Sequence, residues 1–221
     1  MARESADERR KRADEVIRRL REHIPEARCA LHHTNDFQLL VAVILSAQCT
    51  DERVNKVTPA LFQTVKGPAD VLKLGAAKLE KAIGSINFFR TKAKNILGAA
   101  QMLMDQHGGK VPANLDDLTA LPGVGRKTAN VVLGEIFAVP GIVVDTHVRR
   151  VTNRLRLTKE LEPVDIERDL EKVLARDAWI ISSHLFILHG RQTCNARKPL
   201  CGECVLRRLC PSRDLDPDAW K

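Results

Sequence analysis

Apolar residues recur at helical intervals along nearly the whole chain, beginning in its highly charged opening segment. There Ala13, Val16, Ile17, Leu20 and Ile24 are spaced three or four positions apart. This spacing places them on one face of a helix, while the charged residues between them face solvent. Pro25 disfavours further helix, so we predict that the first helix ends there.

Residues 37–48, with the sequence FQLLVAVILSAQ, form an almost continuous apolar run. A run of this kind is compatible with a buried strand or a buried helix. Its length and its alanine content favour a helix, and its lack of a polar face predicts a central position in the fold.

Further segments show the same helical period, and short connections with glycine or proline separate them. Apart from Ile142–Val144, no segment alternates with the period of two that a sheet requires. The pattern therefore predicts an all-α fold. The further helices are expected near 51–65, 69–74, 76–83, 90–107, 115–121, 126–138, 146–156, 163–176 and 179–190.

Composition adds a basic charge to this picture. The 221 residues are enough for one large domain or two small ones, and aromatic residues make up only 4%, so the core must be aliphatic. The formal net charge of +8 favours an acidic partner, with nucleic acid first and an anionic membrane second. Simple solubility is the alternative explanation of the charge.

No apolar run is long enough to span a bilayer, and the N-terminus lacks the apolar centre of a secretory signal. We therefore expect the protein to stay in the cytoplasm, which is a reducing compartment. Clustered cysteines there are more often ligands than disulfides. Cys29 and Cys49 stand in apolar surroundings and are interpreted as small buried residues.

Four cysteines lie close together near the C-terminus, as Cys194-x6-Cys201-x2-Cys204-x5-Cys210. Four thiolates on one short loop can enclose an inorganic centre. The residues alone do not distinguish an iron–sulfur cluster from tetrathiolate zinc, although zinc more commonly uses two paired C-x2-C sequences. The same loop carries Arg197, Lys198, Arg207 and Arg208, so we expect it to hold a polyanion.

The segment 111–138 predicts two helices joined by a glycine hairpin. Asn114 can cap the first helix, Leu121–Gly125 forms the hairpin, and Arg126 begins the second helix. Backbone N–H groups at that second N-terminus suit a phosphate oxygen. Gly123 and Gly125 would let a nucleic-acid backbone approach. An ordinary turn between helices explains the hairpin equally well.

Lys127 and Asp145 are candidates for chemistry. Lys127 lies in the first helical turn, where the helix dipole disfavours a cation, and partial burial would disfavour its charge further. A neutral amine can form a Schiff base with a sugar carbon, whereas a solvated surface lysine is the alternative. Asp145 would cap the next helix, or would offset positive charge developing on a sugar.

Three segments together resemble the endonuclease III family of helix-hairpin-helix DNA glycosylases with AP-lyase activity. They are LPGVGRKTA at 121–129, VDTHV at 144–148 and the four-cysteine pattern at 194–210. The similarity continues in order over nearly the whole chain, including 39–51 and 187–204. The mismatch adenine glycosylases share the cluster but usually have serine at the position of Lys127 and carry an additional C-terminal domain.

This resemblance implies an enzyme of base excision repair that removes oxidised pyrimidines from duplex DNA and cleaves on the 3′ side of the abasic site. Lys127 would be the nucleophile, Asp145 the catalytic carboxylate, and the four cysteines the ligands of a 4Fe–4S cluster. Gln48 would enter the gap left by an extruded nucleotide. Asn87 and Phe88 depart from the common glycine–leucine pattern of the second insertion loop, and either Phe88 or Phe89 could wedge into a base step. The implied DNA contacts are Gln48, Phe88, Gly123, Gly125, Arg126, His147, Arg149, Arg197 and Lys198.

The resemblance also implies an all-α fold with two lobes. A six-helix domain over 29–139 would contain the helix-hairpin-helix near 114–138, and residues 1–28 and 140–211 would form the cluster domain. Lys127 and Asp145 would then flank a cleft between the lobes, and 212–221 would be a tail. The expected partner is damaged double-stranded DNA, with no membrane and no nucleotide cofactor, bound by a monomer.

Overall fold

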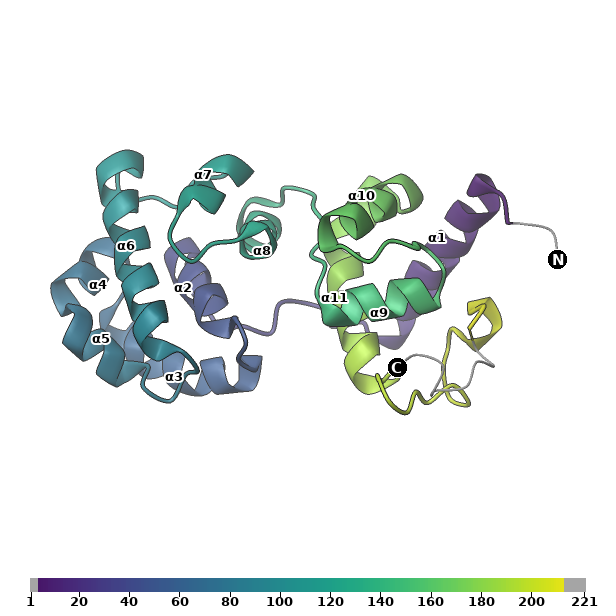
Figure 1. The fold of residues 1–221 in the computed structure, drawn as a ribbon, viewed down its shortest axis with the longest axis horizontal. Coiled ribbons are helices and arrows are strands. Elements are labelled where there is room, and N and C mark those ends of the chain that lie inside the picture. The colour runs from purple at the N-terminus through teal and green to yellow at the C-terminus, as the bar shows by residue number, and fades with distance from the viewer. Residues whose placement is uncertain (1–3, 213–221) are drawn as a thin grey trace. The chain divides into compact units, whose positions relative to one another are not determined.

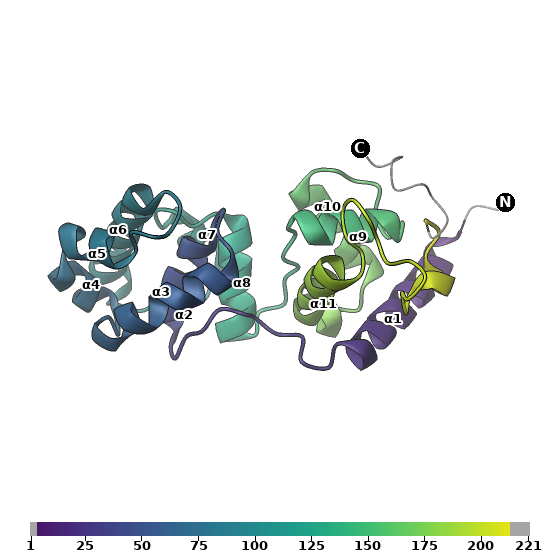
Figure 2. The same cartoon turned by 90° about the horizontal axis from the view of Figure 1, so that it is seen from below.

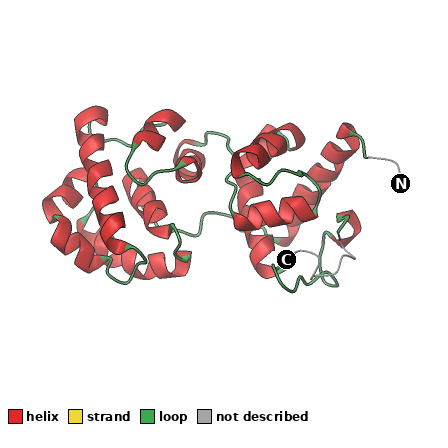
Figure 3. Ribbon diagram, in the orientation of Figure 1, coloured by secondary structure: helices red, strands yellow, loops and turns green. Residues whose placement is uncertain are grey.

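The computed structural model describes residues 4–212, and this part of the chain is helical with no strand. Eleven α-helices and two short 3-10 helices succeed one another through it (Figures 1 and 3). The predicted all-α fold class is thereby confirmed. Residues 142–144, which alternate weakly with the period of a strand, form no regular element and pair with no neighbouring strand among the described residues.

The chain divides into two compact units. Residues 30–139 form one unit, and the segments on either side of them, up to residue 29 and from residue 140, form the other. Each unit has its own buried apolar core. The N-terminal helix therefore folds with the C-terminal part of the chain, from which the whole 30–139 unit separates it in sequence.

The centre of the 30–139 unit is α2 (Asp36–Ser46), in which Phe37 to Leu45 are all buried. It packs against α3, α6 and α8 (Figure 2), which explains why the sequence shows no polar face here. Asn35 caps its start by accepting a hydrogen bond from the Gln38 N–H. The other helices of this unit are α3 (Asp51–Thr64), α4 (Pro68–Leu74), α5 (Ala76–Ala82), α6 (Phe89–His107), α7 (Leu115–Ala120) and α8 (Arg126–Phe137).

The flanking unit is built from α1 (Ala6–His23), α9 (Thr146–Arg154), α10 (Pro163–Val173) and α11 (Trp179–Gln192). Short 3-10 helices η1 (Arg176–Ala178) and η2 (Arg207–Leu209) accompany them. In this unit α11 packs on α1 and α9, while α10 packs on α1. The predicted apolar stripe of α1 is buried in this core, together with Ile142 and Val144.

The structure differs from the sequence-based expectations in several details. The helix expected over 37–48 ends at Ser46, because residues 47–50 form a turn. The two 3-10 helices were not expected. Cys29 and Cys49 are only partly buried, so their interpretation as buried residues was wrong. Of the predicted 212–221 tail, Ser212 is buried, and residues 213–221 lie outside the described range.

Candidate functional site

The hairpin between α7 and α8 is fixed by two buried side chains, Leu121 and Val124, and by a hydrogen bond between their backbones. Gly123 has a left-handed φ of 79°, and a Cβ placed there would lie 2.8 Å from the Asn95 Cβ of α6. Gly125 has no such constraint, because a Cβ there would meet no atom within 4 Å. The protein's own packing therefore requires glycine at 123 and leaves open space at 125.

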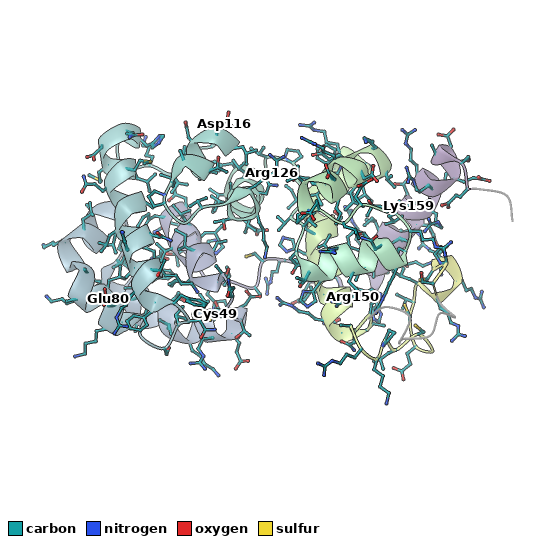
Figure 4. The ribbon with its side chains drawn as sticks, in the orientation of Figure 1. Cys49, Glu80, Asp116, Arg126, Arg150 and Lys159 are labelled. Atoms are coloured by element: carbon teal, nitrogen blue, oxygen red, sulfur yellow. The ribbon has the colours of Figure 1, made fainter. Side chains whose placement is uncertain are left out.

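Lys127 lies in the first turn of α8 and is exposed, so the expectation of partial burial was wrong. Its position follows from helical spacing, because Ala129 and Val132 are fully buried and turn the opposite face of α8 inward. No acidic residue shares this first turn. Arg126 begins the same helix (Figure 4), so two cations and the open position at Gly125 adjoin a set of backbone N–H donors.

Two exposed residues of the same unit, Gln48 and Phe88, have left-handed backbones, with φ of 53° and 56°. Gln48 follows α2, and Phe88 immediately precedes α6 and is 64% exposed. The Asn87 side-chain amide donates to the Gln48 carbonyl oxygen at 3.0 Å. The structure therefore brings the two predicted insertion segments together within one unit.

Asp145 caps α9 in the flanking unit. Its Oδ1 accepts hydrogen bonds from the backbone N–H groups of His147 and Val148, both at 2.8 Å. Its Oδ2 lies 3.1 Å from His147 Nδ1. With 13% of its side chain exposed, the carboxylate is held in one orientation by the helix start and by the imidazole. Arg149 is exposed one turn further along the helix.

All four C-terminal cysteines line one cavity in the flanking unit, beside apolar residues that include Val151, Leu155 and Leu206. None forms a disulfide. Burial raises the pKa of Cys204 to about 11 and also raises the pKa of Cys210, and the charges of neighbouring cysteines act in the same direction. Among the described residues, no group of three or more His, Cys, Asp or Glu is arranged to hold a metal ion.

Two arginines of α9 bind the first cysteine's segment. Arg150 (Figure 4) donates to the Gly190 and Cys194 carbonyl oxygens at 2.8 and 3.1 Å. Arg154, only 5% exposed, donates to the carbonyl oxygens of Asn195 and Ala196 at 2.7 and 2.8 Å, and lies 3.4 Å from Cys194 Sγ. The helix that Asp145 caps therefore also anchors the cysteine loop. Arg197 and Lys198, which follow this anchored segment, are exposed.

Sequence reasoning missed Lys92, Arg150 and Arg154. Lys92 is only 5% exposed although it is charged. Both it and Arg154 adjoin apolar helix faces, next to Ala93 and Leu155 respectively. A cation beside an apolar stripe is a signal of a buried, hydrogen-bonded side chain, but only the structure shows which carbonyl groups it binds.

The chain matches a sequence family over much of its length. The model of the HhH-GPD superfamily of base excision DNA repair proteins matches residues 41–176. Endonuclease III of Synechocystis is 52% identical over 206 residues, with 92% of this chain and 94% of the relative covered. Endonuclease III of Escherichia coli is 44% identical over 200 residues, with 90% and 95% covered.

Solved structures give the same result. A structure of a non-covalent endonuclease III–DNA complex matches with a TM-score of 0.87 and 42% identity, covering 92% of this chain and 96% of the other. A thermostable thymine-DNA glycosylase, at 23% identity and a TM-score of 0.83, shares the fold. No helix of the described residues has the length and apolar character needed to cross a membrane. The chain belongs to the HhH-GPD superfamily of base excision DNA repair proteins, in its endonuclease III group, and is a DNA glycosylase.

Proposed function

We propose that this glycosylase is bifunctional: it removes oxidised pyrimidines from duplex DNA and then cleaves the strand as an AP lyase. The observation that carries this proposal is the exposed Lys127 amine beside the open Gly125 position on α8. Support also comes from a solved structure described as a trapped endonuclease III–DNA covalent intermediate, which is 42% identical over 92% of this chain.

The proposed reaction begins with extrusion of the damaged nucleotide, because its glycosidic carbon is inaccessible within the base stack. The Lys127 amine, after losing its proton, attacks C1′ while the base departs with the glycosidic electron pair and is protonated. Asp145 offsets the positive charge that develops on the sugar. The C1′–O4′ bond of the resulting aminal then breaks, the ring oxygen takes up a proton, and the nitrogen lone pair forms the Schiff base. The Schiff base acidifies the 2′ hydrogen, and loss of that hydrogen as a proton expels the 3′ phosphate by β-elimination.

Binding would use the groups that surround these residues within each unit. The α8 N-terminus, with Gly123, Gly125 and Arg126, provides backbone donors and a cation for phosphate oxygens. Gln48 and Phe88 would enter the duplex where the nucleotide has left it. The flanking unit would add further cationic or imidazole contacts from His147, Arg149, Arg197 and Lys198.

We propose that Cys194, Cys201, Cys204 and Cys210 hold a 4Fe–4S cluster. The chemistry of the donor set fits, because four free thiols line one cavity among apolar residues and Arg154 lies 3.4 Å from one of the sulfur atoms, although these side chains are not arranged as metal ligands in this structure. When bound, the cluster supplies four iron–thiolate bonds that tie the loop together. Tetrathiolate zinc is the competing occupant, and it would leave the purified protein without visible absorbance.

Borohydride trapping on lesion DNA tests the proposed chemistry. Lys127→Ala should abolish the trapped protein–DNA adduct, whereas Lys78→Ala, which removes another exposed lysine of the same unit, should retain it. Trapping of Lys127→Ala at the wild-type level would assign the nucleophile to another residue. Strand cleavage on thymine glycol, dihydrouracil, abasic and A·8-oxoguanine duplexes would define the range of lesions.

Strand cleavage and light scattering test two further parts of the proposal, the absence of a nucleotide cofactor and the monomeric state. We propose that the protein acts as a cytoplasmic, nucleoid-associated monomer without a nucleotide cofactor. Cleavage should therefore proceed in buffer without nucleotide, and light scattering should give the mass of one 24.7 kDa chain. A mass corresponding to two chains at working concentration would contradict the monomer.

A further inference from the structure

Gln48 and Phe88 are held in a backbone conformation that L-amino acids rarely adopt. Their φ values of 53° and 56° fall in the left-handed region, although neither residue is glycine. Such a conformation costs about 1 kcal/mol or more for each residue and persists only when the surroundings hold it. Both residues are also exposed, so burial of their own side chains does not supply the compensation.

Two hydrogen bonds connect the segments that carry these residues. The Asn87 Nδ2, from the segment that carries Phe88, donates to the Gln48 carbonyl oxygen at 3.0 Å. In the opposite direction, Arg53 of α3 donates through Nη1 to the Ser85 carbonyl oxygen at 3.2 Å. The two segments therefore bind each other through a side chain from each side, with Asn87 adjacent to Phe88.

A buried lysine adds a third connection. Lys92 Nζ donates to the Leu45 and Ala47 carbonyl oxygens at 2.8 and 2.6 Å, at the C-terminal end of α2. These carbonyl groups have no partner within the helix, and an ammonium is favoured at this end of the helix dipole. Lys92 lies one turn after Phe88, whose carbonyl oxygen accepts from the Lys92 backbone N–H at 3.0 Å. The start of α6 thus fixes the end of α2.

We propose that Asn87 and Lys92 are positioning residues that lock Gln48 and Phe88 into a single rigid wedge. The binding energy that Gln48 gains in the duplex then depends on Phe88, and the reverse also holds, because the same hydrogen bonds hold both residues in place. The Asn87 contribution depends on its side-chain amide, which a glycine at this position would lack. The inference rests on the proposed insertion of Gln48 and Phe88 into DNA.

A double-mutant cycle on binding affinity tests the lock. Gln48→Ala and Phe88→Ala would be measured singly and together on a duplex with a tetrahydrofuran abasic analogue, which binds without being cleaved through a Schiff base. In the wild-type background, the combined loss of affinity should differ from the product of the single losses by about tenfold. In the Asn87→Ala background, the losses should multiply to within about twofold.

Ser85→Ala is the matched control, because only the backbone carbonyl of this exposed residue takes part in the connection. The coupling should persist in this control, and the melting temperature should stay at the wild-type value in both Asn87→Ala and Ser85→Ala. The fluorescence of 2-aminopurine opposite the analogue should rise on binding in the wild type and the control. It should rise less in Asn87→Ala.

Three results would overturn the lock. They are multiplicative losses in the wild-type background, equal coupling in the Asn87→Ala background, and the absence of any affinity loss in the single variants. Base release and borohydride trapping are measured separately on cleavable lesions. Failure of the proposed chemistry in those assays is therefore distinguishable from failure of the lock, which the binding cycle reports without catalysis.

Discussion

At the scale of single residues, Asp145 combines a structural and a proposed chemical role in one carboxylate. Its Oδ1 accepts both backbone hydrogen bonds at the start of α9, and its Oδ2 faces the His147 ring. An asparagine can keep the Oδ1 bonds but carries no negative charge. The two roles are therefore separable by substitution.

Asp145→Asn should leave thermal stability close to that of the wild type and reduce single-turnover base release far more than DNA affinity. Asp145→Ala should also destabilise the protein by about 1 kcal/mol, because it removes the helix cap. Denaturant unfolding and single-turnover kinetics on a thymine glycol duplex measure these effects. An equal loss of affinity and turnover in Asp145→Asn would make the carboxylate structural only.

Lys92 is a second residue whose effect on stability follows from its burial and its hydrogen bonds. It is nearly fully buried, and burial lowers the pKa of its ammonium. Lys92→Met preserves much of the apolar stem but leaves two carbonyl groups at the end of α2 without their donor. The loss should reduce the free energy of unfolding by about 1.5–3 kcal/mol, measured by urea denaturation. Lys94→Met, which lacks these bonds, should change it by less than about 0.5 kcal/mol.

At the scale of elements, the hairpin between α7 and α8 contains two glycines, and the physical reason for glycine differs between the two positions. Gly123 is required by its left-handed backbone and by the proximity of Asn95, both of which belong to the folded protein alone. Gly125 has an ordinary φ of −88° and open space around its missing side chain. The open position is where a nucleic-acid backbone is proposed to approach.

Gly125→Ala should therefore leave the melting temperature unchanged and weaken binding to abasic-analogue duplexes, because the added methyl group obstructs the phosphate. Gly123→Ala should lower the free energy of unfolding by about 1 kcal/mol or more through backbone strain and the contact with Asn95. Calorimetry and fluorescence anisotropy distinguish the two effects. Normal affinity in Gly125→Ala would place the DNA backbone elsewhere.

Hydrophobic spacing predicted most elements, because a buried helix face leaves a period that sequence alone records. The continuous run at 37–48 indicated the central α2 for the same reason. Its exact end was not predictable, since the carbonyl groups there are satisfied by Lys92, which is distant in sequence. Similarly, the LPGVGRKTA sequence identified Lys127 as a candidate residue. Its exposure depends on which face of α8 is buried, and in the structure that face carries Ala129 and Val132.

At the scale of the whole molecule, the two units differ in what stabilises their cores. The 30–139 unit contains a central helix buried from Phe37 to Leu45. In the flanking unit, four cysteines line a cavity at the edge of the core, and Arg150 and Arg154 connect Cys194 to α9. The cysteine spacing predicted that the four thiols would be used together, whereas nothing in the sequence predicted that α9 would anchor the loop.

This difference predicts that losing the proposed cluster affects one unit selectively. Cys204→Ser should abolish visible absorbance and speed amide hydrogen exchange in the cysteine loop and in α9, because buried thiols there favour the neutral form without a metal. Exchange in α2 and α6 should stay at wild-type rates, since their packing involves no cysteine ligand. Cys49→Ser, outside the cluster loop, is the control and should retain absorbance and exchange rates. Equal acceleration in both units, or none in α9, would contradict a stabilising role confined to the flanking unit.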